Sequence, residues 1–258
     1  MFNLRGLKSQ KLVPKAMDIS FLTLYKDELD GFFRRGVIHR AIESGIINLN
    51  TIQLRDYADP PHYKVDDYPF SNRKGMLLRY DVLKKALSAA PSNATLIISD
   101  PKGAPFNHQV AKQLSQQSHL YFISPAYEGV DARIFNAFSI ASYSMGDFIV
   151  PNGDSAAVMM AEAVVRYLPG VLGCSECLED DSILSGLLEA PQYSSPRSID
   201  QMPVPDVLLS GHHQEIDRWK LIQSLRQTLY RRPDLINRFP FDQTLVKMID
   251  QIIMEDIQ

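Results

Sequence analysis

Short apolar runs alternate with helically spaced segments over the first two thirds of the chain. Three of the runs are mainly apolar, as in buried strands, and another alternates apolar and polar residues. The expected strands are residues 17–24, 46–54, 95–99 and 120–124, and the expected helices are residues 26–44, 77–89, 107–117 and 155–168. Strands that alternate with helices predict an α/β fold with a mostly parallel sheet.

Three loops rich in glycine and proline follow these elements. They have the sequences DPKG (100–103), PAYEG (125–129) and SMGDFIVPNG (144–153). In parallel sheets, ligands bind beyond the carboxyl ends of the strands. We therefore look for the functional site at these loops.

The last third of the chain has a different pattern. Glycines and prolines interrupt residues 171–200 as in a linker, and helical spacing returns up to residue 258. We predict four segments, and the last of them is a small all-helical domain. The segments are a basic extension at 1–16, an α/β domain at 17–170, a linker at 171–200 and a helical domain at 201–258.

Composition narrows the class of protein. The chain has 258 residues, of which 45% are hydrophobic and 22% charged, as in a soluble globular protein. No apolar run approaches the roughly 18–20 residues of a membrane span, so we expect no membrane partner. The formal net charge of −3 argues against binding nucleic acid through a bulk positive field, although a local basic patch is compatible with it.

The basic start of the chain has three interpretations. Its four cations are Arg5, Lys8, Lys11 and Lys15, and it contains no acidic residue. The apolar core of a secretory signal is missing. A disordered basic extension, a start site upstream of the true one at Met17, and a short organellar presequence are the interpretations that this composition leaves.

The two cysteines, Cys174 and Cys177, form a single C-x-x-C. A structural zinc site needs four ligands, so this spacing alone is a weak metal signal and we predict no metal site. A reversible disulfide and two incidental thiols are the other interpretations. Few cysteines and no export signal favour the cytoplasm.

Several specific motifs occur in a fixed order along the chain. They are LRDY (54–57), HYKVDD (62–67), YEGVDAR (127–133), SMGDF (144–148), RYLPGVLG (166–173), EDDS (179–182), LLSGHHQEI (208–216) and RWK (218–220). In this order the chain resembles the bacterial tRNA (guanine-N1)-methyltransferases, the TrmD family of the SPOUT superfamily. The resemblance extends over nearly the whole chain from Met17, with a few residues missing near Pro91.

The resemblance implies a fold, a donor and partners. It implies a homodimeric enzyme that methylates guanine 37 in the anticodon stem-loop of tRNA, with no DNA partner. It also implies that S-adenosylmethionine binds in a trefoil knot at the carboxyl end of the α/β domain, which is an exception to the rule that chains do not thread their loops. The residues expected to bind the donor are Ser99, Asp100, Pro101, Gly103, Pro125, Tyr127, Glu128, Tyr143, Ser144, Met145, Gly146, Phe148, Val150, Asn152 and Gly153.

Two residues are expected to carry the chemistry. Methylation at guanine N1 requires removal of the N1 proton, which suits a carboxylate base, and negative charge then builds on the ring, which suits an arginine. By resemblance these are Asp181 and Arg166. From the residues alone, Asp181 lies in an acidic triplet typical of a solvated turn, and Arg166 is typical of a helix surface.

The resemblance and the charge pattern also suggest an RNA-binding surface. The residues expected to bind RNA are Asp66, Arg73, His212, Arg218, Lys220 and Arg226. The basic residues near the C-terminus are interleaved with Glu215, Asp217 and Asp234, so a mixed solvated face is the alternative interpretation.

The expected donor loops depart from the family pattern. Asp100 and Lys102 occupy positions that are polar or small in the family, and Pro125 replaces a glycine and removes an amide donor. Ala126 replaces an arginine, and Asn152 replaces one of two adjacent glycines. The alternative function is therefore a non-catalytic or substrate-shifted paralogue that binds tRNA or another RNA with an impaired donor pocket.

Overall fold

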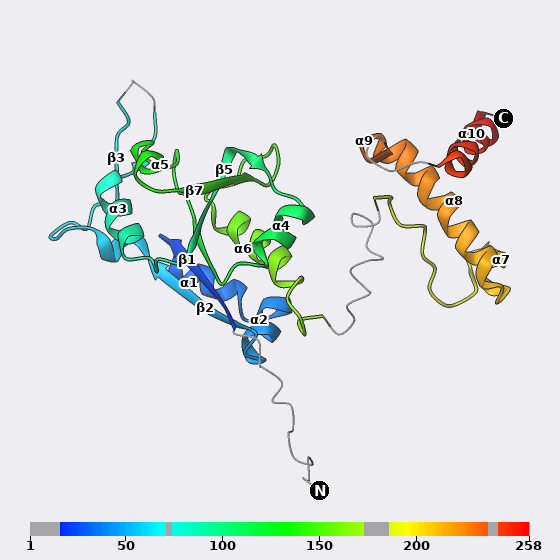
Figure 1. Cartoon of the computed structure of the whole chain (residues 1–258), viewed down its shortest axis with the longest axis horizontal. Helices are drawn as coiled ribbons and strands as arrows, with labels where there is room; N and C mark the ends of the chain where they lie inside the picture. The colour runs from blue at the N-terminus through cyan, green and yellow to red at the C-terminus, as the bar shows by residue number, and fades with distance from the viewer. Residues whose placement is uncertain (1–15, 71–73, 173–185, 237–241, 258) are drawn as a thin grey trace, which may run out of the picture. The chain divides into compact units, whose positions relative to one another are not determined.

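The computed structural model describes residues 16–70, 74–172, 186–236 and 242–257. Met17 and most of the expected elements lie within these ranges, whereas the basic extension, Cys174 and Cys177 lie outside them. The chain divides into two compact units, Met1–Gly173 and Cys174–Gln258. Each unit is described by itself (Figure 1).

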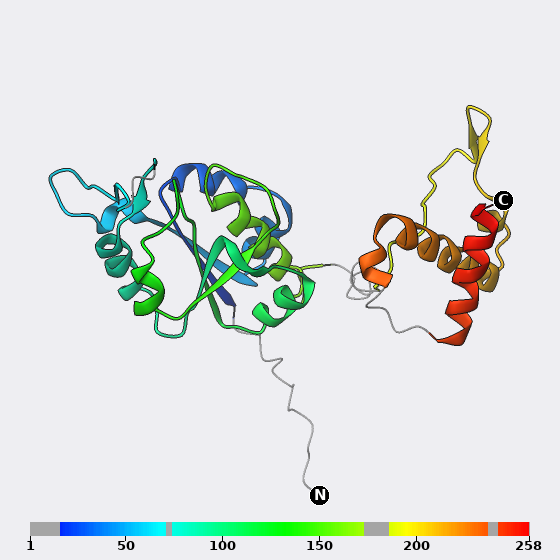
Figure 2. The same ribbon diagram turned by 90° about the horizontal axis from the view of Figure 1, so that it is seen from above.

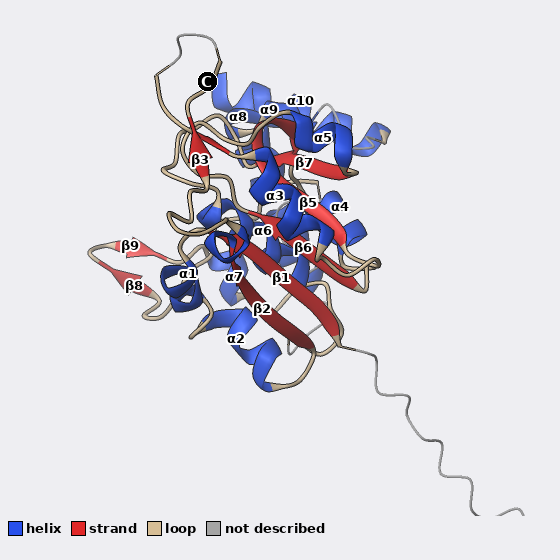
Figure 3. Cartoon of the chain, turned by 90° about the vertical axis from the view of Figure 1, so that its left-hand side faces the viewer, coloured by secondary structure: helices blue, strands red, loops and turns tan. Residues whose placement is uncertain are grey.

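The first unit is built on a five-stranded sheet. Its strands are β1 (Met17–Thr23), β2 (Ile47–Gln53), β5 (Thr95–Pro105), β6 (His119–Ile123) and β7 (Ile140–Ser144). They lie side by side in the order β2-β1-β6-β5-β7, and every pairing is parallel (Figure 3). The expected α/β fold with a mostly parallel sheet is confirmed.

Helices cover both faces of the sheet, as the view in Figure 2 also shows. The larger core lies under α1 (Lys26–Phe32), α2 (Gly36–Glu43), α4 (His108–Leu114) and α6 (Asp154–Val165). In α2 the apolar residues Val37, Ile38 and Ala41 recur at helical spacing and are all buried. Phe21 and Phe122 stack at its centre, with ring centroids 5.2 Å apart.

The second core occupies the opposite face. It lies under the short 3₁₀ helix η1 (Leu54–Tyr57), α3 (Tyr80–Ser88) and α5 (Arg133–Ala137). Between η1 and α3 the chain forms a short antiparallel pair, β3 (Asp66–Asp67) and β4 (Leu77–Leu78). Backbone bonds join this pair to the chain after β6, since Leu78 N–H donates to Gly129 O and Asp131 N–H donates to Leu78 O.

One local expectation was wrong, and one strand was not predicted. The helix expected over residues 26–44 is two helices, because Gly36 has a φ of +84°, which a continuous right-handed helix cannot contain. Strand β7 was not expected, because its sequence IASYS has neither an apolar run nor a clean alternation, and all five of its residues are half-buried. Its pairing with β5 fixes it as a strand.

The second unit is mainly helical in its described part. Its helices are α7 (Asp206–Leu209), α8 (His213–Arg231), α9 (Pro233–Ile236) and α10 (Gln243–Ile257), and Leu187, Leu225 and Ile252 form its core. A short hairpin of β8 (Ser198–Ile199) and β9 (Met202–Pro203) precedes them. Asp200 and Gln201 turn it with positive φ at both positions, a hairpin signal that helical spacing does not reveal. Among the described residues, no helix is both long and apolar enough to cross a membrane.

Candidate functional site

The first wall of the site is an excursion within β5. Ser99 and Ala104 both pair with Tyr143 of β7, so residues 100–103 loop out of the ladder between them. The carboxylate of Asp100 accepts the Lys102 N–H at 2.9 Å and closes this loop. A Cβ on Gly103 would lie 2.5 Å from the backbone of Ser142 and Tyr143, so only glycine fits there.

The second wall is the loop after β6. The Ser124 N–H donates to Leu22 O at 2.9 Å, which anchors the loop to β1. Tyr127 has a φ of +59°, in the left-handed region that few side chains adopt, and Gly129 follows with a φ of +108°. The loop therefore turns sharply and leaves the Tyr127 ring half in solvent.

The third wall is the chain between β7 and α6, which closes against the other two at Gly153. The Gly153 N–H donates to Pro125 O at 2.7 Å, and Ala126 forms an isolated bridge with Asn152. A Cβ on Gly153 would lie 2.4 Å from both Pro125 Cδ and Ser99 Oγ. The excursion within β5 and the loops after β6 and β7 thus meet at one glycine.

These loops enclose a cavity of about 400 Å³ at the carboxyl ends of the strands. Volumes of this order are typical of small-molecule sites. Of the residues expected to bind the donor, Gly103 alone is not in the cavity wall. Those in the wall are Ser99, Asp100, Pro101, Pro125, Tyr127, Glu128, Tyr143, Ser144, Met145, Gly146, Phe148, Val150, Asn152 and Gly153. Gly103 instead packs against the backbone of β7.

The wall also contains residues that the sequence analysis did not include. Ala132 and Phe135 enter it from the start of α5, and Ile149 and Ala156 from either side of Gly153. Ala132 is inside the YEGVDAR motif, which is the only sequence signal that could have indicated it. Ile149 is fully exposed and Phe148 is 56% exposed, so the third loop presents a bare apolar rim.

A buried carboxylate lies directly behind this cavity. Asp154, the first residue of α6, is 6% exposed, and burial raises its pKa above the ordinary value, an effect that the Thr23 hydroxyl opposes. Its Oδ1 has no hydrogen-bond partner within 3.5 Å among the described residues. The first residue of α6 is therefore a buried carboxylate with one oxygen that lacks a hydrogen bond within the described part of the chain.

The β3–β4 segment contacts the cavity wall at Glu128. Glu128 N–H donates to Met76 O at 2.9 Å, and a Cβ on Gly75 would lie 2.4 Å from the Glu128 side chain. Asp66 lies close enough to Tyr127 that its charge contributes, after burial, to raising the pKa of that phenol.

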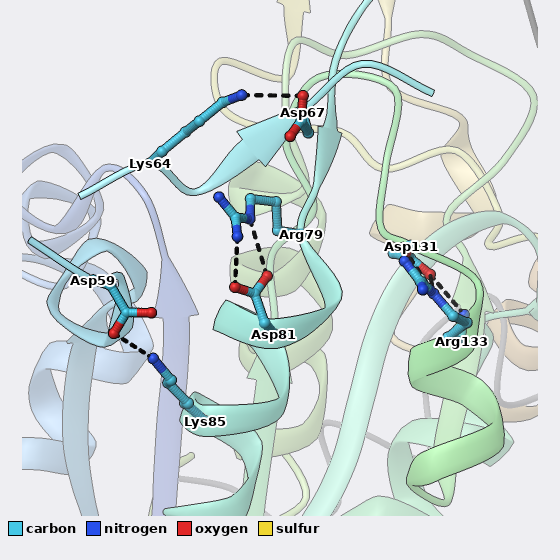
Figure 4. A network of polar contacts seen from close by, with 8 residues as sticks. All are labelled: Asp59, Lys64, Asp67, Arg79, Asp81, Lys85, Asp131 and Arg133. Atoms are coloured by element: carbon cyan, nitrogen blue, oxygen red, sulfur yellow. Dashed lines mark hydrogen bonds and ion pairs between the residues drawn. The ribbon is translucent and has the colours of Figure 1, made fainter. Parts of the chain in front are cut away.

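Four ion pairs between described residues lie at the surface of the first unit (Figure 4). Those on the segment around η1, β3 and α3 are Lys64–Asp67, Arg79–Asp81 and Lys85–Asp59. Arg133 also pairs with Asp131 at the start of α5. Exposed pairs of this kind each contribute little to stability, about 0–1 kcal/mol.

Comparison with known families gives a direct match. A model of the family described as tRNA (Guanine-1)-methyltransferase TrmD matches residues 17–238. The chain belongs to this family. Members of the TrmD family in staphylococci are similar to it over almost their full length.

Three of these relatives carry the name tRNA (guanine-N(1)-)-methyltransferase. The protein of Staphylococcus haemolyticus (strain JCSC1435) is 40% identical over 236 residues, which cover 91% of this chain and 96% of the relative. That of Staphylococcus epidermidis (strain ATCC 12228 / FDA PCI 1200) is 41% identical over 229 residues, 88% and 94% of the two chains. That of Staphylococcus aureus (strain MRSA252) is 42% identical over 226 residues, 87% and 92%.

Arg166, one of the two residues expected to carry the chemistry of a TrmD enzyme, is not at this cavity. Arg166 is exposed and follows the last residue of α6, whereas the cavity adjoins the first. The 12 residues of α6 separate these two ends by about 18 Å. Asp181 and Arg73 lie outside the described residues.

The second unit contains the other residues expected to bind RNA. His212 precedes α8, and Arg218 and Lys220 are exposed on its first turns. Arg226 lies further along α8, and its guanidinium donates to Glu255 at 3.0 Å and to Asp256 at 3.1 Å on α10. Arg226 thus joins two helices of its own unit.

No metal site is found in the part of the chain that the structure describes. Groups of three or more His, Cys, Asp or Glu side chains that could hold a metal ion do not occur there. The C-x-x-C lies within residues 173–185, outside the described part.

Proposed function

We propose that the chain is an S-adenosylmethionine-dependent tRNA (guanine-N1)-methyltransferase that acts on guanine 37 of the anticodon loop. One observation carries this proposal: three loops converge at Gly153 around a cavity of about 400 Å³, in a chain of the TrmD family. The relatives that are about 40% identical carry the name of this activity.

The cavity fits the donor in size and charge. Asp100 and Glu128 outnumber Lys102 among the charged residues of the wall. A wall with a net negative charge favours a ligand with a net positive one. S-adenosylmethionine has two cationic groups and one carboxylate, so it meets this condition.

The donor supplies an electrophilic methyl group when bound, and the residues of the chain prepare the guanine. We assign to Asp181 the role of the base that removes the N1 proton. Arg166 would stabilise the negative charge that develops on the ring and O6. We assign to His212, Arg218 and Lys220 contacts with the tRNA, because all three are exposed in the second unit.

The position of Arg166 supports a homodimeric site. An arginine side chain is much shorter than α6, whose 12 residues extend about 18 Å. Arg166 therefore cannot reach the cavity of its own chain along this helix. We infer that the Arg166 and Asp181 of one subunit act at the cavity of the other.

We also propose that the three loops form the trefoil knot of the SPOUT superfamily. Gly153 fits between Ser99, where β5 leaves the ladder, and Pro125, which follows β6. The chain that leaves β7 thus passes between the ends of two strands formed earlier in the sequence, which supports a threaded path.

A calorimetric titration with S-adenosylmethionine, with and without tRNA, is the first test. We expect micromolar affinity. Asp181→Asn should then lower the methylation rate of a transcript carrying guanine 37 by roughly 10²-fold or more, with donor affinity unchanged. Asp180→Asn, in the same acidic triplet, is the matched control and should retain activity. Equal losses in the two variants would contradict the assignment of Asp181.

A non-catalytic or substrate-shifted RNA-binding paralogue is the second candidate. The observation in its favour is Pro125, which lines the cavity without an amide donor and packs against Gly153. The same titration separates the two functions. No heat at millimolar donor, together with retained binding of tRNA, would replace the enzyme with this alternative.

A further inference from the structure

One face of the sheet changes from apolar to polar toward the amino ends of three neighbouring strands. Near their carboxyl ends, Leu22, Ile52 and Ile123 belong to the second core. Side chains two residues apart on a strand share a face, so the residues that precede these lie on the same side of the sheet. They form two rows across β2, β1 and β6, namely Asn48, Asp18 and His119, then Asn50, Ser20 and Tyr121. We call these six residues the polar grid.

The polar grid lines a second cavity of about 420 Å³, as large as the one at the loops. Tyr57 of η1 borders it on one side, and Ala89 and Pro91, just after α3, border it as well. No residue of the site described above lines this cavity.

Half of the polar grid is buried, whereas Asn48 and Asn50 are exposed at the edge strand. Ser20, His119 and Tyr121 are 4%, 6% and 1% exposed. Within the grid, Asn48 Nδ2 donates to Asp18 Oδ1 at 2.9 Å, and Ser20 Oγ bonds His119 Nε2 at 2.9 Å. The Tyr121 hydroxyl has no hydrogen bond to another residue that the structure describes. Tyr121 lines the cavity, and a hydroxyl at a cavity wall without a protein partner is free to bond water or a ligand.

The charges and shape of the cavity indicate the class of ligand. Burial lowers the pKa of His119, so its imidazole is neutral at pH 7, and Asp18 is the only carboxylate in the wall. Such a wall disfavours anions. The amides of Asn48 and Asn50 offer both donors and acceptors, and the Tyr57 ring and Pro91 offer apolar surfaces.

We propose that the polar grid binds a nucleobase, presented either by a free nucleoside or by an unpaired nucleotide of an RNA. The two rows of hydrogen-bonding groups match the donors and acceptors along the edge of a heterocycle, and Tyr57 can contact its face. The grid lies at the amino ends of the strands, whereas the loop cavity lies at their carboxyl ends. Binding at the grid is therefore independent of the methyl donor and of the proposed function.

The test is a titration of the full chain with guanosine and cytidine, with S-adenosylmethionine present in excess, followed by NMR or calorimetry. We expect saturable binding that the donor does not displace. Guanosine 5′-monophosphate should bind more weakly than guanosine, because Asp18 repels its phosphate. Tyr121→Phe should weaken binding roughly five- to tenfold, through loss of one hydrogen bond in a buried site.

Matched variants separate a binding defect from a folding defect. Tyr80→Phe removes a hydroxyl outside the cavity and should leave the affinity unchanged, and thermal melts show whether each variant folds. Asn50→Ala changes an exposed grid residue on the edge strand and should weaken binding without unfolding the chain.

The source of the base is resolved by a parallel titration with a single-stranded trinucleotide. Binding of the nucleosides alone indicates a small-molecule ligand, and binding of the trinucleotide indicates a base of RNA; either supports the proposal. It is overturned if nothing binds at about 10 mM ligand, if the donor displaces the nucleoside, or if Tyr121→Phe and Tyr80→Phe have the same affinity.

Discussion

At the scale of single residues, Gly153 is the contact that holds the loop cavity together. A Cβ there would lie 2.4 Å from Pro125 Cδ and Ser99 Oγ, so Gly153→Ala must push the loops apart. We expect a loss of about 1–3 kcal/mol in stability and at least tenfold in donor affinity. Differential scanning calorimetry and donor titration measure the two effects.

The control for this substitution is Gly31→Ala in α1. No atom lies within 4 Å of a Cβ at Gly31, and its φ is not positive. The change should raise helix stability by about 0.5–1 kcal/mol and leave donor binding unaltered. Unchanged donor affinity in Gly153→Ala would show that the loops do not need to meet at this residue.

Asp154 predicts a pH dependence of stability. Burial raises its folded pKa above the ordinary value of 3.8, so the folded chain retains a proton that the unfolded chain has lost. Its contribution to the free energy of unfolding therefore falls as the pH rises from about 3.8 through the folded pKa. At neutral pH the buried charge is destabilising.

Replacing Asp154 by Asn removes this charge. We expect Asp154→Asn to be more stable than the wild type at pH 7, by about 1.4 kcal/mol for each tenfold rise in the proton affinity of the folded carboxyl. The advantage should disappear below pH 3.8. Urea unfolding of both proteins between pH 4 and 8 measures the difference, and a gap that does not vary with pH would rule out the titration of Asp154 as its cause.

At the scale of elements, α4 depends on the residue that precedes it, Asn107. The Asn107 side chain accepts the N–H groups of Gln109 at 3.0 Å and Val110 at 3.1 Å, which caps this seven-residue helix. Asn107→Ala should lower the free energy of unfolding by about 1 kcal/mol. Asn107→Ser keeps a hydrogen-bond acceptor and should lower it much less. Chemical denaturation compares them, and equal losses would mean that the cap contributes nothing.

The elements also show how much of the fold the sequence predicted. Strands β1, β2 and β6 were predictable because apolar runs or alternation mark them directly. The break between α1 and α2 depends on the backbone angle at Gly36, and β7 depends on its pairing with β5, neither of which a local pattern contains. The loops were located by their glycines and prolines, but the orientation of Gly103 toward the β7 backbone is a tertiary fact.

The site was predicted from resemblance more than from pattern. Ser99 and Gly153 are far apart in the sequence, and no hydrophobic periodicity indicates that they meet. The resemblance to the family, carried by the order of the motifs, supplied that expectation. The pairing of Arg226 with Glu255 and Asp256 was missed, because these residues are 29 and 30 positions apart and only helix packing brings them together. We therefore expect Arg226→Ala to lower the stability of the second unit as well as any affinity for RNA.

At the scale of the whole molecule, the two compact units have separate cores. Leu225 is fully buried in the second core, whereas the loop cavity belongs to the first unit. Leu225→Ala should lower the free energy of unfolding of the second unit by about 2–5 kcal/mol and leave that of the first unit unchanged. Calorimetry of the full chain should show one transition moved to lower temperature and another unchanged.

The functional consequence of this variant should be equally selective. If the second unit binds tRNA, Leu225→Ala weakens tRNA binding at temperatures above its lowered transition, while donor affinity changes less than about threefold, well under 1 kcal/mol. Donor and tRNA titrations on the same sample measure both quantities. A single transition shifted as a whole, with parallel loss of both affinities, would mean that the two cores fold as one cooperative unit.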